Sequence, residues 1–328
     1  MKKIYYLISL CFFSCLETSN NQQILVKNLG ETQGTFYSIS YLSQNHNFQN
    51  EIDSILKQID QSLSTYNQAS IISTINRNEN IKTDTLFNQV FRKAQYVYKK
   101  TDGYFDCTIS PLVNFWGFGP YEKEQIDSSK IEKLVSLVGS DKLTIVDNHL
   151  KKPKSVMLDF NGIAQGYSVD IISLFLENQG IHNYLVEIGG EIRVQGLNAD
   201  NMLWRIGISE PSEELNNNLY VILALKNKSL ATSGNYRKFY KENGMKYSHI
   251  INPFSGYPAK NRLLSASVIT KDCILADAYA TAFMAMGLEK TKEFLEINSN
   301  LAGYLIYTDD TGLLQSYYSK NFEEYFLH

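Results

Sequence analysis

The sequence predicts an α+β fold in which mainly antiparallel sheets are flanked by helices. Short strand-like segments between residues 184 and 270 follow one another through tight turns such as Gly189-Gly190, which favours antiparallel pairing over strand-helix-strand crossovers. Segments with apolar residues at helical spacing precede and follow this run. Elements that are grouped in this way indicate an α+β protein.

One domain is predicted for residues 24 to 328. Hydrophobic residues make up 44% of the 328 positions and charged residues 20%, a composition that allows a large buried core. No internal repeat, low-complexity block or long linker interrupts this part of the chain.

Helices are predicted where apolar residues recur three and four positions apart. In the first such segment, Ile52, Ile55, Leu56 and Ile59 form the apolar stripe. The predicted helices cover residues 49–63, 86–100, 128–138, 164–179, 274–286 and 289–298.

Strands are predicted where short apolar runs lie between turn residues. They cover residues 35–41, 143–146, 184–188, 191–195, 204–208, 220–225, 229–232, 247–251, 265–270 and 302–307. A further buried strand is expected at Val156-Met157-Leu158, joined by an Asn161-Gly162 turn to the helix that begins at Ala164. Because a helix start presents N–H groups without helical partners, this junction is either a plain connection or an anion site.

Residues 1–15 predict a lipoprotein signal peptide. Lys2-Lys3 precede an apolar run, Ile4 to Phe13, that is too short to span a bilayer. The run ends at Ser14-Cys15, similar to a relaxed bacterial lipobox, so cleavage before Cys15 and acylation of its thiol would anchor the mature chain to a membrane. The alternative is a simple signal peptide with incidental cysteines. Residues 16–23 predict a flexible tether.

The overall charge provides no electrostatic argument for nucleic-acid binding. Lys and Arg total 31, Asp and Glu total 34, and the formal net charge is -3. If the chain binds phosphates, a local group must neutralise them, and a divalent cation is the obvious choice. Cys107 and Cys273 lack the spacing of a zinc site and predict no disulfide framework.

Asp277 and Thr281 are the strongest pair of metal-ligand candidates. Their spacing of four places both oxygens on one face of the predicted helix. A carboxylate and a hydroxyl, joined by carbonyl oxygens of another segment, would make a hard oxygen site suited to Mg²⁺. Spacing alone also allows, and by itself favours, a helix-capping or surface role for Asp277.

Four other motifs are candidates for a functional or a structural role. His249 ends a predicted strand before a turn rich in Gly and Pro, where a functional or a merely hydrogen-bonded histidine is equally expected. The hydroxyl-rich loop 232–236 suits phosphate or ribose contacts. The aromatic run 115–119 favours a core role, and Gly189-Gly190-Glu191 favours a structural turn.

The order of these motifs resembles the ApbE-type FAD:protein FMN transferases, formerly called thiamine biosynthesis lipoproteins. The resemblance spans the chain from about residue 25 to 310 and implies an ApbE-like, T-fold-related architecture. The motifs that carry it are Gly34 to Tyr37, Ser64 to Asn67 with Ser70, Asp102 to Phe118, Leu158 to Asp170 (LDFNGIAQGYSVD), Glu187 to Glu191, Ala231 to Tyr236, His249 to Pro258, and Ala276 to Thr281.

The resemblance implies Mg²⁺-dependent cleavage of the FAD pyrophosphate. FMN would pass through a phosphoester to a Ser or Thr hydroxyl of an acceptor flavoprotein, such as a respiratory electron-transfer subunit, with release of AMP. The enzyme would be exported, lipid-anchored to a bacterial membrane and facing the periplasm. Two alternatives remain open: an FAD pyrophosphatase that yields FMN and AMP, and a non-catalytic flavin-binding lipoprotein.

The same resemblance implies roles for individual residues. The metal ligands would be the backbone carbonyl of Gly162 and the side chains of Asp277 and Thr281, and His249 would act with Asp277 in catalysis beside the reacting phosphate. The implied contacts to FAD come from Gln33, Tyr66, Tyr104, Phe105, Asp106, Asp159, Gln165 and Ile251.

Four positions depart from the family pattern. Gln33 replaces the common Met, Cys107 the common Pro, and Asn252 the common Asp. Gln165 replaces a common Lys and matters most, because an amide can supply hydrogen bonds but no charge. This departure concerns the affinity for the dinucleotide more than the type of reaction.

Overall fold

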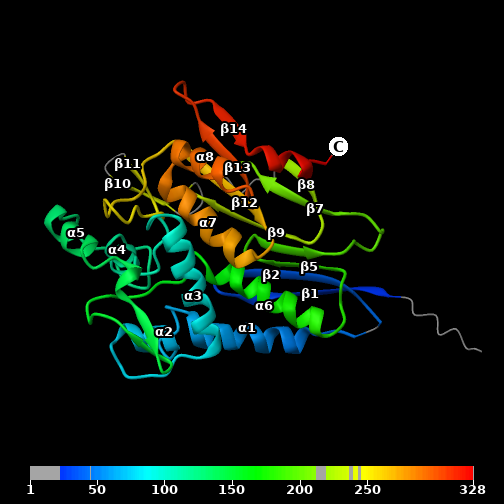
Figure 1. Ribbon diagram of the computed structural model, residues 1–328, viewed down its shortest axis with the longest axis horizontal. Coiled ribbons are helices and arrows are strands. Elements are labelled where there is room, and N and C mark those ends of the chain that lie inside the picture. Colours follow the sequence, from blue (N-terminus) through cyan, green and yellow to red (C-terminus); the bar gives the residue numbers. More distant parts are fainter. Residues whose placement is uncertain (1–22, 45, 212–218, 236–238, 243–244, 328) are drawn as a thin grey trace, which may run out of the picture.

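The computed structural model describes residues 23–44, 46–211, 219–235, 239–242 and 245–327, and it confirms the α+β class (Figure 1). An eight-stranded sheet has the order β1-β2-β5-β6-β9-β12-β13-β14, and every neighbouring pair is antiparallel. Its strands are β1 (Ile24–Thr32), β2 (Thr35–Ser43), β5 (Tyr184–Ile188), β6 (Glu191–Gln195), β9 (Lys228–Gly234), β12 (Leu263–Thr270), β13 (Ala302–Thr308) and β14 (Leu314–Tyr318).

Within the described residues, three two-stranded sheets accompany the large one. They pair β3 (Thr144–Val146) with β4 (His149–Lys151), β7 (Trp204–Ser209) with β8 (Leu219–Leu225), and β10 (Phe239–Glu242) with β11 (Met245–Ser248). The helices are α1 (Gln49–Leu63), α2 (Ile71–Asn76), α3 (Thr85–Lys100), α4 (Ser110–Phe115), α5 (Ser128–Val135), α6 (Ala164–Asn178), α7 (Cys273–Met286) and α8 (Leu288–Ile297), with 3₁₀ turns at Ser140–Lys142 and Lys320–Tyr325.

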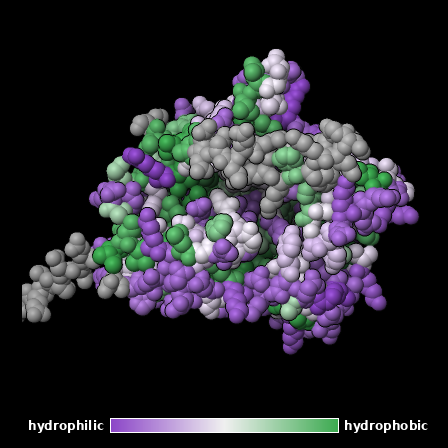
Figure 2. All heavy atoms as spheres, turned by 180° about the vertical axis from the view of Figure 1, so that it is seen from behind, coloured by the Kyte–Doolittle hydropathy of each residue, from purple (hydrophilic) through white to green (hydrophobic). Residues whose placement is uncertain are grey.

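The large sheet is covered on both faces. Because side chains alternate along a strand, Val268 of β12 lies in the core that contains α7, whereas the next residue, Ile269, lies in the core formed with β7 and β8. Helix α7 is buried over almost its whole surface, as expected for a helix that is apolar all round. By contrast, α1 is amphipathic, and hydrophilic side chains line the lower edge of the molecule where it lies (Figures 1 and 2).

A two-residue turn joins β1 to β2. Gln33 has φ of 51° and Gly34 has φ of 72°, the left-handed conformations that a tight hairpin turn of this kind requires. Thr32 and Thr35 close the ladder on either side. This turn places Gln33 at one end of the sheet, where it lines a cavity.

The strand prediction for Val156 to Leu158 was wrong. This segment has no partner strand, because the side-chain amide of Asn76 takes that place: Leu158 N donates to Asn76 Oδ1 at 2.7 Å, and Asn76 Nδ2 donates to Leu158 O at 2.9 Å. The predicted strand 247–251 likewise ends at Ser248, and Ile251 makes only an isolated bridge to Pro258.

The expected Asn161-Gly162 turn and the helix from Ala164 are present. The two remaining cysteines, Cys107 and Cys273, are free and buried and form no disulfide with each other. In the part of the chain that the structure describes, no helix is long and apolar enough to cross a membrane. Cys15, the predicted signal peptide and the tether up to residue 22 lie outside the described residues. The single domain over residues 24 to 328 stays a prediction.

Candidate active site

A cavity of about 1090 Å³ opens where the ends of the sheet meet α6, α7 and the loops below them. Figure 2 shows a hollow near the middle of the rear face of the molecule. The structure brings to this one cavity every residue for which a catalytic, metal or dinucleotide role was predicted within the described chain: Gln33, Tyr66, Tyr104, Phe105, Asp106, Asp159, Gly162, Gln165, His249, Ile251, Asp277 and Thr281. Their individual roles stay predictions.

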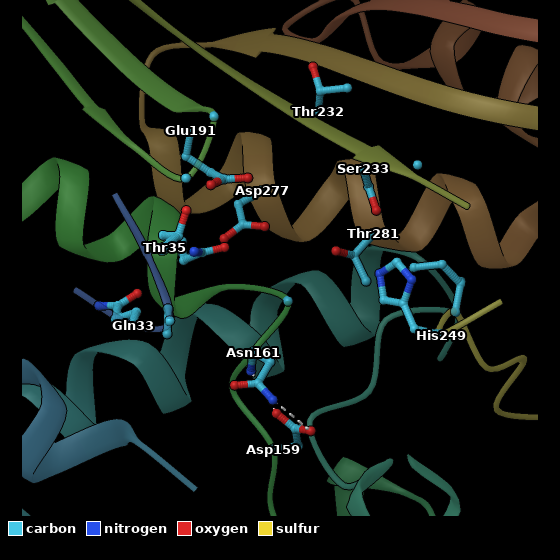
Figure 3. A pocket seen from close by; sticks show the side chains of 18 of the residues that line it. Gln33, Thr35, Asp159, Asn161, Glu191, Thr232, Ser233, His249, Asp277 and Thr281 are labelled. Atoms are coloured by element: carbon cyan, nitrogen blue, oxygen red, sulfur yellow. Dashed lines mark hydrogen bonds between the residues drawn. The ribbon is translucent and has the colours of Figure 1, made fainter. Parts of the chain in front are cut away.

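Asp277 and Thr281 point into the cavity from one face of α7 (Figure 3). Asp277 is only 7% exposed, and its Oδ2 accepts the backbone N–H of Gly166 at 2.9 Å. Burial raises the pKa of this carboxyl to about 7, although the hydrogen bond from Gly166 lowers it. A buried carboxylate of this kind is stabilised by a cation bound beside it.

Gly162 lies directly against Thr281. A Cβ placed on Gly162 would stand 3.0 Å from Thr281 Cγ2 and 3.1 Å from Thr281 Oγ1. The turn backbone and the Thr281 hydroxyl are therefore close enough to belong to one site. Only a residue without a side chain keeps this approach free of crowding.

These oxygen donors fit Mg²⁺. Within the described ranges, no group of three or more His, Cys, Asp or Glu could hold a metal ion. The predicted site consists of the Asp277 carboxylate, the Thr281 hydroxyl and the Gly162 carbonyl. It offers three oxygen ligands, of which one is charged. Mg²⁺ is commonly held by one or two carboxylates, with waters and substrate phosphates completing its shell, whereas zinc needs nitrogen or sulfur ligands.

His249 follows β11 and projects toward the same cavity as Thr281 (Figure 3). Its ring centroid lies 6.3 Å from that of Phe118, at an interplanar angle of 68°. Phe118, from the loop after α4, lines the cavity as well. An imidazole in this position can exchange a proton with a group bound in the cavity.

Asp106 and Asp159, whose carboxyl groups are predicted to contact the dinucleotide, also hold loops in place. Asp159 Oδ1 accepts the backbone N–H of Asn161 at 2.7 Å, and Asp106 accepts from Thr108 N at 2.8 Å and from Ser140 N at 3.2 Å. Burial raises the pKa of both carboxyls, and these hydrogen bonds oppose the shift. Both side chains thus shape the cavity wall whether or not they touch a ligand.

The aromatic residues predicted to contact FAD lie at different depths. Phe105 is buried, whereas Tyr66 is 59% exposed. The ring of Tyr104 packs against Phe254, with 4.8 Å between ring centroids, and its hydroxyl accepts a hydrogen bond from Lys290 Nζ at 2.5 Å. The cavity wall therefore offers a flat ring whose position is already fixed by packing.

The two glutamines link the cavity wall to the helix α6. Gln33 Nε2 donates to Ser168 Oγ at 2.6 Å. Gln165 packs against the β5–β6 turn, since a Cβ placed on Gly189 would stand 2.6 Å from Gln165 Nε2. Gln165 thus forms part of the cavity wall.

Glu191 lines the cavity, although the sequence predicted only a structural turn there. The Gly189-Gly190 turn is formed as expected, but Glu191 is 7% exposed and lines the cavity, and Figure 3 shows it on the side of the cavity near Asp277. The signal that could have revealed it is an acidic residue placed directly after a tight turn, at a position facing the core. Glu187 lines the cavity too, and burial raises the pKa of its carboxyl.

Two further motifs, the aromatic run 115–119 and the loop 232–236, contribute to the core and to the cavity. Phe115 and Trp116 are buried in a hydrophobic cluster, as expected, and Trp116 Nε1 donates to Gly256 O at 2.7 Å. Thr232, Ser233 and Gly234 line the cavity. Tyr236, the last residue of that loop, lies outside the described residues.

Comparison with solved structures shows a shared architecture. The flavin transferase ApbE from Vibrio cholerae aligns with a TM-score of 0.83 at 36% identity, over 92% of this chain and 99% of that one. The apo flavinyl transferase ApbE of Pseudomonas stutzeri aligns with a TM-score of 0.84 at 31% identity, over 93% of this chain and 98% of that one. The fold therefore places this chain in the structural class of the flavin transferases.

Sequence comparison specifies the family. The model of the ApbE family matches residues 33–305. The FAD:protein FMN transferase of Vibrio cholerae is 36% identical over 90% of this chain and 91% of its own length, and that of Haemophilus influenzae is 33% identical over 96% of both. The chain belongs to the ApbE family.

Proposed function

We propose that this enzyme, an FAD:protein FMN transferase, cleaves the pyrophosphate of FAD in a Mg²⁺-dependent reaction. FMN passes to a Ser or Thr hydroxyl of an acceptor flavoprotein, where a phosphoester bond forms, and AMP leaves. The transferase activity rests on relatives of this name that match nearly the whole chain. The observation that carries the chemistry is the convergence of Asp277, Thr281 and Gly162 in one cavity.

Mg²⁺, when bound, supplies the positive charge that a pyrophosphate needs in order to be attacked and split. The Asp277 carboxylate, the Thr281 hydroxyl and the Gly162 carbonyl would hold it. The hydrogen bond from Gly166 orients the Asp277 carboxylate, so that one oxygen is committed to α6 while the side chain points into the cavity. This carboxylate is therefore oriented before a ligand arrives.

His249 is the residue best suited to take the proton of the attacking hydroxyl. It lines the cavity together with Thr281, and an imidazole can accept a proton from a hydroxyl bound beside it. The proton moves from the acceptor hydroxyl to the imidazole as the oxygen attacks the phosphorus of the FMN half, and the bond to the AMP phosphate breaks.

The binding of FAD would use the ring surfaces of Tyr66, Tyr104 and Phe105 and the polar wall formed by Gln33, Gln165, Asp106 and Asp159, with Ile251 adding apolar contact. Flat aromatic and apolar surfaces suit an isoalloxazine or adenine ring, which gains affinity by stacking.

We further propose that the mature chain is exported and held on a bacterial membrane, facing the periplasm, by acylation of Cys15. The signal-like segment before Cys15 supports this. An anchored enzyme of this kind would meet acceptors that are also held at the membrane, such as a subunit of a respiratory electron-transfer complex.

One experiment separates transfer from its alternatives. The full chain is incubated with FAD and Mg²⁺, with and without an acceptor flavoprotein. AMP and protein-bound flavin are then measured. We expect protein-bound flavin and an equal amount of AMP, both absent when the acceptor Ser or Thr is changed to Ala. AMP without any acceptor would favour a pyrophosphatase, and the absence of both products would favour a non-catalytic flavin binder.

Asp277→Ala should lose both products and stay folded, and full activity in that variant would refute the metal site.

A further inference from the structure

Helices α6 and α7 hold each other through a reciprocal pair of carboxylate contacts. Asp277 on α7 accepts the N–H of Gly166, in the first turn of α6, at 2.9 Å. In return, Asp170 on α6 accepts the N–H of Cys273 at 3.0 Å and that of Ile274 at 2.9 Å, in the first turn of α7. Each helix therefore supplies an acid to the N-terminus of the other, where N–H groups have no helical partner.

The cap of α7 comes from another helix, not from its own sequence. Asp272 occupies the N-cap position of α7 but makes no side-chain hydrogen bond to it. Asp170 takes over that function with both of its oxygens, and it is itself held by Arg193 of β6, whose Nη1 lies 2.8 Å from Asp170 Oδ1. Arg193 Nη2 also contacts Glu177 Oε1, at 3.2 Å, so its guanidinium is fixed from both sides.

The two helices approach each other closely where these contacts lie. A Cβ placed on Gly166 would stand 2.4 Å from the carbonyl oxygen of Cys273 and 2.7 Å from Asp277 Cβ. Helix α6 begins directly after the Gly162 turn, and α7 carries Asp277 and Thr281. A slide or rotation of one helix against the other therefore changes the distance between the carbonyl oxygen and the two side-chain oxygens.

We propose that Asp170 is a positioning residue for the metal-binding oxygens: by capping α7 from α6, it sets the register in which Gly162 faces Asp277 and Thr281. Asp170 does not line the cavity. This inference rests on the proposed Mg²⁺ site. The test is chosen so that a failure of the inference differs from a failure of the metal site.

The test measures metal affinity directly, with Mn²⁺ as the probe in place of Mg²⁺. Free Mn²⁺ is followed by electron paramagnetic resonance as it is titrated with the full chain. Because residues that orient metal ligands typically change metal affinity 10- to 100-fold, Asp170→Ala should raise the Mn²⁺ dissociation constant at least about tenfold. Asp170→Asn should raise it less, since an amide oxygen still accepts one N–H but loses the charge that pairs with Arg193.

Turnover provides the second readout. The Mg²⁺ concentration for half-maximal transfer should rise in parallel, while the FAD concentration for half-maximal rate at saturating Mg²⁺ stays within about twofold. Glu177→Gln is the matched control, because it alters the other carboxylate contact of Arg193 without touching α7, and it should leave the Mn²⁺ affinity unchanged.

The outcomes are distinct. A purely structural Asp170 would lower the melting temperature but leave the Mn²⁺ affinity of the folded chain as in the wild type, and that result would overturn the proposal. If Asp277→Ala also binds Mn²⁺ normally, or the wild type binds none, the metal site itself is refuted and the inference falls with it. If Asp277→Ala loses Mn²⁺ while Asp170→Ala keeps it, only the inference fails.

Discussion

The backbone N–H of Gly166 donates to the Oδ2 of Asp277 over 2.9 Å, so that a carboxylate of the predicted metal site also closes the N-terminus of the neighbouring helix. The contact joins two residues 111 positions apart in the chain. It gives Asp277 the capping role that the sequence left open, with the difference that the capped helix is not its own. Its role as a metal ligand stays a prediction.

Gly166→Ala should destabilise the fold and the site together. The added methyl would meet the Cys273 carbonyl at 2.4 Å and Asp277 Cβ at 2.7 Å, and overpacking of a rigid core costs about 1–3 kcal/mol or more. We expect a loss in that range in the free energy of unfolding, measured by urea denaturation. A variant as stable as the wild type would show that α6 and α7 can move apart freely.

Gly162→Ala should weaken metal use while leaving the fold nearly intact. The new Cβ would stand 3.0 Å from Thr281 Cγ2, so one of the two must shift by a few tenths of an ångström. We expect the Mg²⁺ concentration for half-maximal transfer to rise about tenfold or more. Adding Thr281→Ser removes Cγ2 but keeps the hydroxyl, and this second change should recover most of the loss; no recovery would argue against steric displacement as the cause.

Gln165→Lys should strengthen the binding of FAD. It restores a positive charge beside the dinucleotide, and a charge-assisted contact is worth about 1 kcal/mol more than a neutral one, which corresponds to roughly a fivefold lower half-saturating FAD concentration. Gln165→Met, which removes both hydrogen bonds and charge, should shift the FAD dependence the other way. Equal FAD dependence in both variants would show that Gln165 does not face the phosphates or ribose.

The stability of the metal-free protein should depend on the ionisation of Asp159. Burial raises the pKa of this carboxyl above its ordinary value, so the folded chain binds its proton more tightly than the unfolded chain does. The unfolding free energy should therefore fall as the pH rises through the range between the unfolded and the folded pKa. Asp159→Asn should make the decline shallower in urea denaturation series from pH 4 to pH 8 with a chelator present. An unchanged slope would show that Asp159 does not cause this pH dependence.

Cys15→Ser should release the chain from the membrane. Without the thiol no acyl chain can be attached, and a protein without an anchor does not stay in the bilayer fraction. Fractionation of cells that produce the tagged wild type and variant, followed by immunoblotting, measures this. Cys11→Ser serves as the control and should remain in the membrane fraction.

Much of the secondary structure could be predicted because it depends on local spacing. The apolar stripe of α1 and the alternation in β5 and β6 lead to the bounds that the structure has for these elements. The six-residue helices α2 and α4 were missed because they are too short to show a helical period. Val156 to Leu158 was mistaken for a strand because an apolar run does not reveal whether its partner is a strand or, as here, the Asn76 amide.

By itself the sequence determined the α+β class, the order of the motifs, and with them the family and a set of candidate site residues. These follow from spacing along the chain and from residue types. Only the tertiary structure decided which of these residues meet: the capping of α7 by Asp170, the placement of Glu191 in the cavity, and the approach of Gly162 to Thr281. Such contacts depend on how two helices distant in sequence pack, and periodicity within either helix carries no information about their relative register.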